Sequence, residues 1–254
     1  MKRILLAFLL ILLPISPTQS STLVTLTAPT TKLADGRFIN NELAISISPG
    51  GNLGKALEIT PSNSRTWLID PALIEEITDL VDGYIYLDQE GKDVEVAPFD
   101  LANTWLIKLR FLISNNRVVA ITYGAPSQAF LERIAPGELL NYNSLSKLRL
   151  EAFLNREVIA PGKSGVAGEP ALIAKNAYTA LRKSIKINNS VITSKDVEDL
   201  RLGLAKTLNP ALSKDDALLI SKSYSAAIKG VNNKLRISPG NYTITTKNYD
   251  LPVT

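Results

Sequence analysis

The sequence predicts an α/β fold in which alternating strand–helix units form a mostly parallel sheet or part of a barrel. Over residues 21–185, short apolar segments rich in β-branched residues alternate with longer amphipathic segments, as in βαβ units. The strand-like segments are apolar without strict alternation, as expected for strands covered on both faces. Downstream, the pattern becomes helical and then strand-like again. We therefore add a helical extension and the start of a β module to the prediction.

The first predicted element is a strand over residues 22–27 (TLVTLT), where polar and apolar side chains alternate. Asp35-Gly36 predicts a turn. Residues 42–47 fit either a strand or a helix, and the Ser-Pro-Gly-Gly sequence that follows ends this element.

A strand and a helix meet at Asp70. Residues 66–70 (TWLID) predict a short buried strand, and helix signals follow at once. Asp70 is placed to cap the helix and Pro71 to occupy its first position, while Gly83 is typical of its end. The predicted apolar face consists of Leu73, Ile74, Ile77, Leu80 and Val81.

A second unit of the same kind follows. Asp100 is predicted to cap a helix whose apolar face includes Trp105, and the Asn-Asn pair at 115–116 ends it. Residues 117–123 (RVVAITY) then predict a strand, in which we expect Val119 and Ile121 to be buried.

The remaining elements follow from the same signals. The Gly-Ala-Pro-Ser turn at 124–127 leads into a helix, and Ser194 or Asp196 and Ser213 are placed to begin two later helices, with Gly230 ending the last. The predicted elements are helices over 128–134, 144–154 and 170–185, a strand over 157–160, and the two helices within 194–229.

Residues 231–254 change character again, to short strand-like segments separated by turns. Three short strands cannot bury a core alone, so we expect the sequence to be a fragment or a truncated relative of a longer protein. The predicted organisation is a signal peptide over 1–20, an α/β domain over 21–185, a helical extension over 186–230 and an incomplete β-sandwich-like module over 231–254.

Residues 1–20 are predicted to be a secretory signal peptide. Lys2 and Arg3 form a basic start, and residues 4–13 are continuously apolar. This stretch suits a signal peptide and is too short to cross a bilayer, which needs about 20 residues. Small residues at 18 and 20, the two positions that a signal peptidase reads, favour cleavage after Ser20; an uncleaved N-terminal anchor is the alternative. We expect a secreted or extracytoplasmic protein of the cell envelope.

Composition restricts the chemistry. The sequence has no Cys and no His, which excludes disulfides, a thiol nucleophile, a Ser-His-Asp triad and a His-ligated zinc. The net charge of +4 falls to +2 without Lys2 and Arg3, and no basic run is dense enough for nucleic acid. We expect no cofactor, no metal site and no nucleic-acid partner. A membrane contact is expected only through an uncleaved signal or a C-terminal anchor outside this sequence.

Three residues are candidate ligand-binding positions. Asp70 and Tyr123 follow predicted strands, at the carboxyl edge where α/β folds place their sites, and Ser127 lies in the turn after Tyr123. Asp70 is also the only candidate catalytic residue, as a glycosidase acid, although an ordinary helix cap is the role we favour for it. A glycosidase needs a second carboxylate facing the first, and the strand ending at Tyr123 supplies Gly124, Ala125 and Ser127 instead.

Three segments stand out at the strand–helix junctions and near the end of the sequence: 67–73 (WLIDPAL), 123–127 (YGAPS), and 242–246 (YTITT) with 251–254 (LPVT). They resemble an uncharacterised actinobacterial family of exported, membrane-anchored cell-envelope proteins, encoded beside the lipid II flippase. The resemblance implies a glycosidase- or deacetylase-like α/β domain, β-sandwich modules and a C-terminal membrane helix. The family's second strand–helix junction usually reads Tyr-x-Asp-Pro-Asp, where this sequence has Ala125 and Ser127.

Together these observations favour an exported envelope protein that binds a glycan or another envelope component, including envelope proteins, without catalysis. A carbohydrate-active hydrolase of glycosidase or deacetylase type using Asp70 is the first alternative. A structural scaffold for further modules is the second.

Overall fold

The computed structural model describes residues 22–162, 167–191 and 195–234. The mixed α/β class is confirmed: a parallel three-stranded sheet is covered by helices, and a separate two-stranded sheet is antiparallel. The sheet order is β1-β2-β5, an open sheet rather than part of a barrel, and its strands are β1 (Thr22–Leu26), β2 (Arg65–Ile69) and β5 (Arg117–Ala120).

Four helices and a hairpin belong to the N-terminal half of the chain. The ambiguous segment at 42–47 is helical, and the antiparallel hairpin was not predicted, since its strands are short and mostly half-exposed. These elements are α1 (Glu42–Ile47), α2 (Asn52–Ala56), α3 (Pro71–Asp79), β3 (Tyr84–Leu87), β4 (Asp93–Val96) and α4 (Asp100–Ile113).

Helix α3 begins as its sequence predicts. Asp70 occupies the N-cap, where its carboxylate accepts a hydrogen bond from the backbone N–H of Ala72 at 2.9 Å, and Pro71 is the first helical residue. Leu73 and Ile77 are buried on its apolar face, and Gly83 has a positive φ of 98° shortly after its end.

The start of α4 differs from the prediction. Asp100 is its first helical residue, and the N-cap position belongs to Phe99, which makes no side-chain cap. The carboxylate of Asp100 therefore lies in the first turn, where its charge still suits the positive helix end. Trp105 is buried as predicted, and its indole N–H donates to the carbonyl oxygen of Leu53 at 3.0 Å.

The strand after α4 is shorter than predicted, because β5 ends at Ala120. Ile121 is buried, whereas Val119 is only half-buried and Val118 is the buried valine of the pair. The predicted strand at 157–160 reduces to a single parallel bridge between Ile159 and Val119.

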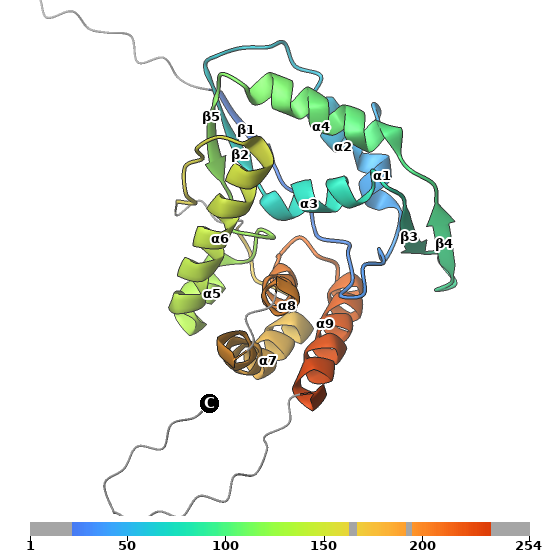
Figure 1. The fold of residues 1–254 in the computed structure, drawn as a ribbon, viewed down its shortest axis with the longest axis vertical. Coiled ribbons are helices and arrows are strands. Elements are labelled where there is room, and N and C mark those ends of the chain that lie inside the picture. Colours follow the sequence, from blue (N-terminus) through green and yellow to red (C-terminus); the bar gives the residue numbers. More distant parts are fainter. Residues whose placement is uncertain (1–21, 163–166, 192–194, 235–254) are drawn as a thin grey trace, which may run out of the picture.

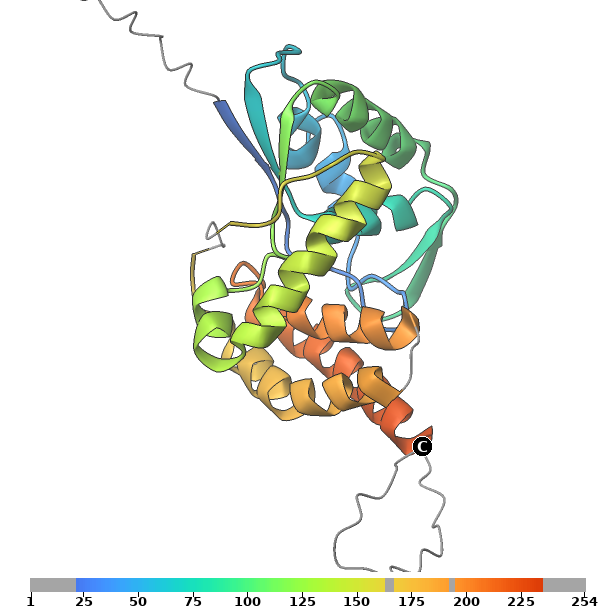
Figure 2. The same cartoon turned by 60° about the vertical axis from the view of Figure 1, so that its left-hand side comes forward.

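Five helices form the other half of the described chain. Figure 1 shows α7, α8 and α9 together at the end of the molecule opposite α4, and Figure 2 shows α6 extending from this group to the sheet. The helices are α5 (Gln128–Ile134), α6 (Pro136–Leu154), α7 (Leu172–Val191), α8 (Lys195–Lys206) and α9 (Lys214–Lys234).

Several predicted boundaries in this half are wrong. Helix α6 begins eight residues before the predicted start at Ser144, and the boundary between 185 and 186 falls inside α7. Gly230 lies within α9, which also includes residues 231–234 of the predicted β module. The rest of that module, and the predicted signal peptide, lie outside the described residues. No helix in the described part is both long and apolar enough to cross a membrane.

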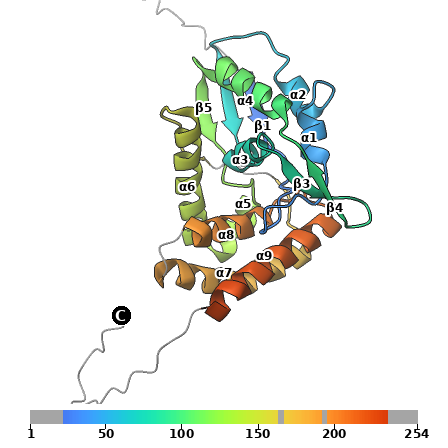
Figure 3. The same cartoon turned by 45° about the vertical axis from the view of Figure 1, so that its right-hand side comes forward.

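Two hydrophobic cores organise the molecule. The first lies around the sheet, α3 and α4, and contains both tryptophans, Trp67 and Trp105. The second lies among α5 to α9 and includes Tyr142 and Tyr178, whose hydroxyl groups are 3.1 Å apart. Helix α6 contributes to both cores. Figure 3 shows α7, α8 and α9, which we call the second group of helices, beneath the carboxyl edge of the sheet.

Candidate functional site

A cleft of about 800 Å³ lies where the carboxyl edge of the sheet faces the second group of helices. We call it the central cleft. The loop after β1, helix α3 and the segment after β5 supply one wall, and α6, α8 and α9 supply the other. Open α/β sheets place ligands at this edge because loops from several strands converge there. Its lining includes Lys32, Glu75, Glu76, Asp79, Tyr123, Arg149, Asp199, Lys206 and Tyr224.

A buried ion pair joins the two walls. The ammonium group of Lys206 on α8 lies 2.9 Å from a carboxylate oxygen of Glu76 on α3, and both side chains are at most 6% exposed. Glu76 also accepts hydrogen bonds from the Thr30 hydroxyl and, at 3.1 Å, from the backbone N–H of Thr31. Burial acts to lower the pKa of Lys206, but the charge and hydrogen bond of Glu76, together with Tyr224 and Tyr123, outweigh it, so the pKa is raised well above its ordinary value.

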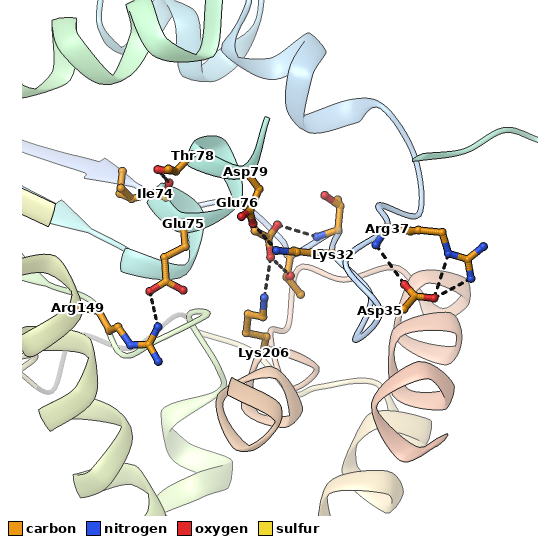
Figure 4. A network of polar contacts seen from close by, with 12 residues as sticks. Lys32, Asp35, Arg37, Ile74, Glu75, Glu76, Thr78, Asp79, Arg149 and Lys206 are labelled. Carbon is orange, nitrogen blue, oxygen red and sulfur yellow. Dashed lines mark hydrogen bonds and ion pairs between the residues drawn. The ribbon is translucent and has the colours of Figure 1, made fainter. Parts of the chain in front are cut away.

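A second charged group is more open. The guanidinium of Arg149 on α6 lies 3.2 Å from Glu75 on α3, and 2.9 Å and 2.6 Å from Glu198 and Asp199 on α8. The hydroxyl of Tyr123 donates to Glu75. Figure 4 shows Arg149 directed at Glu75, and Lys206 directed at Glu76. We call Glu75, Tyr123, Arg149, Glu198 and Asp199 the Arg149 cluster.

Desolvation and neighbouring groups shift the pKa values of Arg149 and Tyr123. Burial acts to lower the pKa of Arg149, but hydrogen bonds and charge from Asp199, Glu75 and Glu198 raise it above its ordinary value. Burial raises the pKa of the Tyr123 hydroxyl well above 10. Both groups therefore keep their protons at neutral pH, and the cluster offers one cation, three carboxylates and one hydroxyl donor.

The lining of the central cleft is acidic on balance, although the whole sequence is basic. Six lining residues are Asp or Glu and four are Lys or Arg, a difference of −2 against +4 for the chain. Most of these charges are paired with one another: Lys32, for example, lies 2.5 Å from Asp79. A ligand with both acidic and basic groups can replace the partners in such pairs, so that each protein charge pairs with a ligand group instead.

Asp70 lies beneath the cleft rather than in its lining. It is 1% exposed, and its Oδ1 accepts hydrogen bonds from the N–H groups of Ala72 and Gly124, each at 2.9 Å. Its other oxygen is buried without a partner. Burial, aided by the nearby charge of Glu76, raises the pKa of Asp70 to about 7.

The turn whose backbone N–H donates to Asp70 requires glycine at position 124. Gly124 has a φ of +75°, and a β-carbon there would lie 2.9 Å from the Cα of Lys206. The side-chain amide of Asn209 donates to the carbonyl oxygen of Gly124 at 3.1 Å. Helix α8 and the segment after it therefore pack closely on the turn, which places Lys206 at the floor of the cleft.

The structure brings two of the three predicted site residues to the same edge. Tyr123 lines the central cleft, and Asp70 lies beside it through its bond to Gly124. Ser127 is 1% exposed and is not part of the lining: its hydroxyl donates to the carbonyl oxygen of Gly168 at 2.7 Å.

The charged residues of the cleft were not predicted as site residues. One signal was present for Glu76, which lies among the apolar residues Leu73, Ile77 and Leu80 on one face of α3. A carboxylate on a buried helix face requires a partner elsewhere in the chain. Nothing in the sequence indicated that Arg149 and Lys206 would meet α3, because both are distant from it in sequence.

No family model matches this chain, and neither the curated proteins nor the solved structures include a match to it. Among the described residues, no group of three or more acidic side chains is placed to hold a metal ion.

Proposed function

We propose that this chain is an exported cell-envelope protein that binds a glycan or another envelope component in the central cleft, without altering it chemically. The observation that carries the proposal is the Arg149 cluster, where one guanidinium, three carboxylates and the Tyr123 hydroxyl converge at the carboxyl edge of the sheet. The cleft volume of about 800 Å³ is within the range of small-ligand sites.

The chemistry of the cluster suits an envelope component that carries amino and carboxyl groups, such as the peptide portion of a peptidoglycan fragment. Arg149 can pair with a ligand carboxylate in a bidentate manner, and Glu75 and Asp199 can accept from an ammonium group. Because these residues already pair with one another, binding exchanges internal ion pairs for ligand pairs. We expect modest affinity and strong dependence on salt.

The export and family parts of the proposal rest on sequence. The basic, apolar and small-residue regions of residues 1–20 support secretion, and the WLIDPAL and YGAPS segments support membership of the envelope family. A structural scaffold for further modules remains compatible with ligand binding, since one chain can do both.

A hydrolase using Asp70 is the second candidate, and one observation favours it. A carboxyl group with a pKa near 7, beside a second carboxylate in Glu76, has the properties of a general acid. Against it, Asp70 and Glu76 are each at most 3% exposed and are hydrogen-bonded to backbone groups of the protein. A glycosidase acid must reach the glycosidic oxygen, so we place the binding function first.

The experiment is to titrate soluble peptidoglycan fragments carrying their stem peptides into the purified chain by calorimetry. Arg149→Ala should weaken binding at least about tenfold, equivalent to roughly 1.4 kcal/mol. Arg133→Ala is the matched control, because Arg133 is exposed on α5, outside the central cleft, and its contacts are a 3.8 Å pair with Glu169 and a cation–π contact with Phe130. Equal affinity in wild type and Arg149→Ala, with matching melting curves, would contradict the proposal. Release of sugar or acetate by wild type, lost in Asp70→Asn, would promote the hydrolase.

A further inference from the structure

A second cavity, of about 650 Å³, lies on another part of the molecule. We call it the side pocket. Its walls are the segment after β1, the helices α1 and α2, and the segment at 211–216 that leads into α9. It therefore joins the first group of elements to the second, as the central cleft does, and it shares no lining residue with that cleft.

The lining of the side pocket differs in kind from that of the central cleft. No lysine, arginine or aromatic residue lines it within the described part of the chain. Aliphatic side chains such as Leu43, Leu53 and Leu212 alternate with groups that bond to hydroxyls. The latter are Thr27, Thr30, Thr31, Glu42, Ser46, Asn52, Ser213 and Asp216.

Two hydroxyl groups in these walls lack a partner. Thr27 and Thr31 each have a buried side-chain oxygen without a hydrogen bond, and Thr31 is 7% exposed. The neighbouring Thr30 shows the contrast, since its hydroxyl donates to Glu76. Leaving a buried hydroxyl unpaired costs about 1–3 kcal/mol. A polar ligand in the pocket can remove this cost by forming hydrogen bonds with the hydroxyls of Thr27 and Thr31 after a small rotation of these side chains.

The charges around the side pocket disfavour anionic ligands and favour ligands with adjacent hydroxyl groups. Because no lysine or arginine is among its described lining residues, the pocket offers no charge to neutralise a phosphate or carboxylate ligand. Its acidic groups are at the rim: Glu42 is exposed, and Asp216 accepts from the Ser213 hydroxyl at 2.7 Å. Carboxylates accept two hydrogen bonds at once and so suit adjacent hydroxyl groups of a ring. Aliphatic walls then cover the ring's C–H surface.

We propose that the side pocket is a binding site for a neutral polyhydroxylated ligand, a saccharide of one or two rings. This site does not require the central cleft to bind anything. The two cavities are nevertheless close, because Thr30 and Thr31 line the side pocket while bonding to Glu76 in the wall of the cleft.

The test is to titrate N,N′-diacetylchitobiose, a neutral disaccharide, into the purified chain by calorimetry, with glucosamine as the cationic comparison. The double variant Glu42→Ala/Asn52→Ala removes two exposed polar groups from the rim. Its matched control is Asn115→Ala/Glu157→Ala, which removes the same chemistry from exposed positions elsewhere. Ala211→Trp is a second variant, designed to fill the pocket from an exposed position in its wall.

We expect saturable binding of the disaccharide that is weakened about tenfold or more in the rim variant and in Ala211→Trp, and unchanged in the control. Binding should also survive Arg149→Ala, so failure of the central cleft as a site leaves this result intact. The proposal would be overturned if the disaccharide shows no saturable binding up to about 10 mM, or if it binds Ala211→Trp as tightly as wild type. Binding of glucosamine alone would overturn it too, since the rim would then recognise a charge.

Discussion

One oxygen of Asp70 links two elements of the fold. It accepts from the N–H of Ala72, which caps α3, and from the N–H of Gly124, which ties the start of α3 to the turn after β5. Its isolation from water follows from packing of α8 on that turn. The sequence identified the residue and its local role, and could not give its burial, because burial depends on segments more than 100 residues away.

The carboxyl group of Asp70 should make stability fall as the pH rises. Its folded pKa of about 7 lies above the unfolded value of 3.8, so between these values the folded state holds a proton that the unfolded state releases. The resulting stability is present below pH 3.8 and is lost as the pH rises through about 7. The slope is at most about 1.4 kcal/mol per pH unit.

Asp70→Asn isolates this effect. The amide oxygen keeps the bonds from Ala72 and Gly124, and its nitrogen takes the place of an oxygen that already lacks a partner. The difference in unfolding free energy between wild type and Asp70→Asn, measured by urea denaturation from pH 4 to 8, should fall with pH. Asp70→Ala also cannot ionise but loses both bonds, so it should be about 2 kcal/mol less stable than Asp70→Asn at every pH in this range. A difference that does not change with pH would mean that Asp70 is ionised throughout.

At the scale of elements, predictions from local signals were the most successful. The α3 start, the α5 bounds and the burial of Trp105 all follow from caps, turns and apolar spacing within a few residues. Errors arose where tertiary packing decides. Gly230 was expected to end a helix, yet α9 continues through it, since one glycine costs a buried helix only about 1 kcal/mol. Residues 157–160 form one bridge because β5 is short.

The turn between β5 and α5 should tolerate no side chain at Gly124. Its φ of +75° nearly equals the +77° of Gly91, but a β-carbon at Gly91 meets nothing within 4 Å. Both alanine substitutions carry the backbone cost of a positive φ, about 1 kcal/mol. Only in Gly124→Ala does the new β-carbon also clash with Lys206. This variant should therefore lose at least about 2 kcal/mol more unfolding free energy than Gly91→Ala, measured by thermal or urea unfolding. Equal losses in the two variants would show that α8 does not press on this turn.

At the scale of the whole molecule, the two cores are joined by charged and polar contacts as well as by α6. The Glu76–Lys206 pair and the Arg149 cluster both cross from α3 to α8. The sequence predicted the α/β class and a change to helices after it, but placed their boundary inside α7. Residues 130 positions apart form the buried pair, and a single sequence without internal symmetry gives no indication of such a contact.

The Glu76–Lys206 pair should make the two cores unfold as one unit. Removing either partner leaves the other charge buried and unpaired, so Lys206→Met and Glu76→Gln should each cost about 3–5 kcal/mol. The double variant should cost clearly less than the sum, because neither charge is then left alone. Removing the exposed pair of Lys92 and Glu90 is the control and should change stability by no more than about 0.5 kcal/mol.

Two probes separate the cores in that experiment. Tryptophan fluorescence reports only the first core, which contains both Trp67 and Trp105, whereas far-UV circular dichroism also reports helices α7, α8 and α9 of the second. In wild type the two transitions should coincide. In Lys206→Met both midpoints should fall together, although Lys206 belongs to α8 and both tryptophans belong to the first core. A loss confined to the dichroism signal would show that the cores unfold separately, and that the ion pair stabilises only the helices on which Lys206 lies.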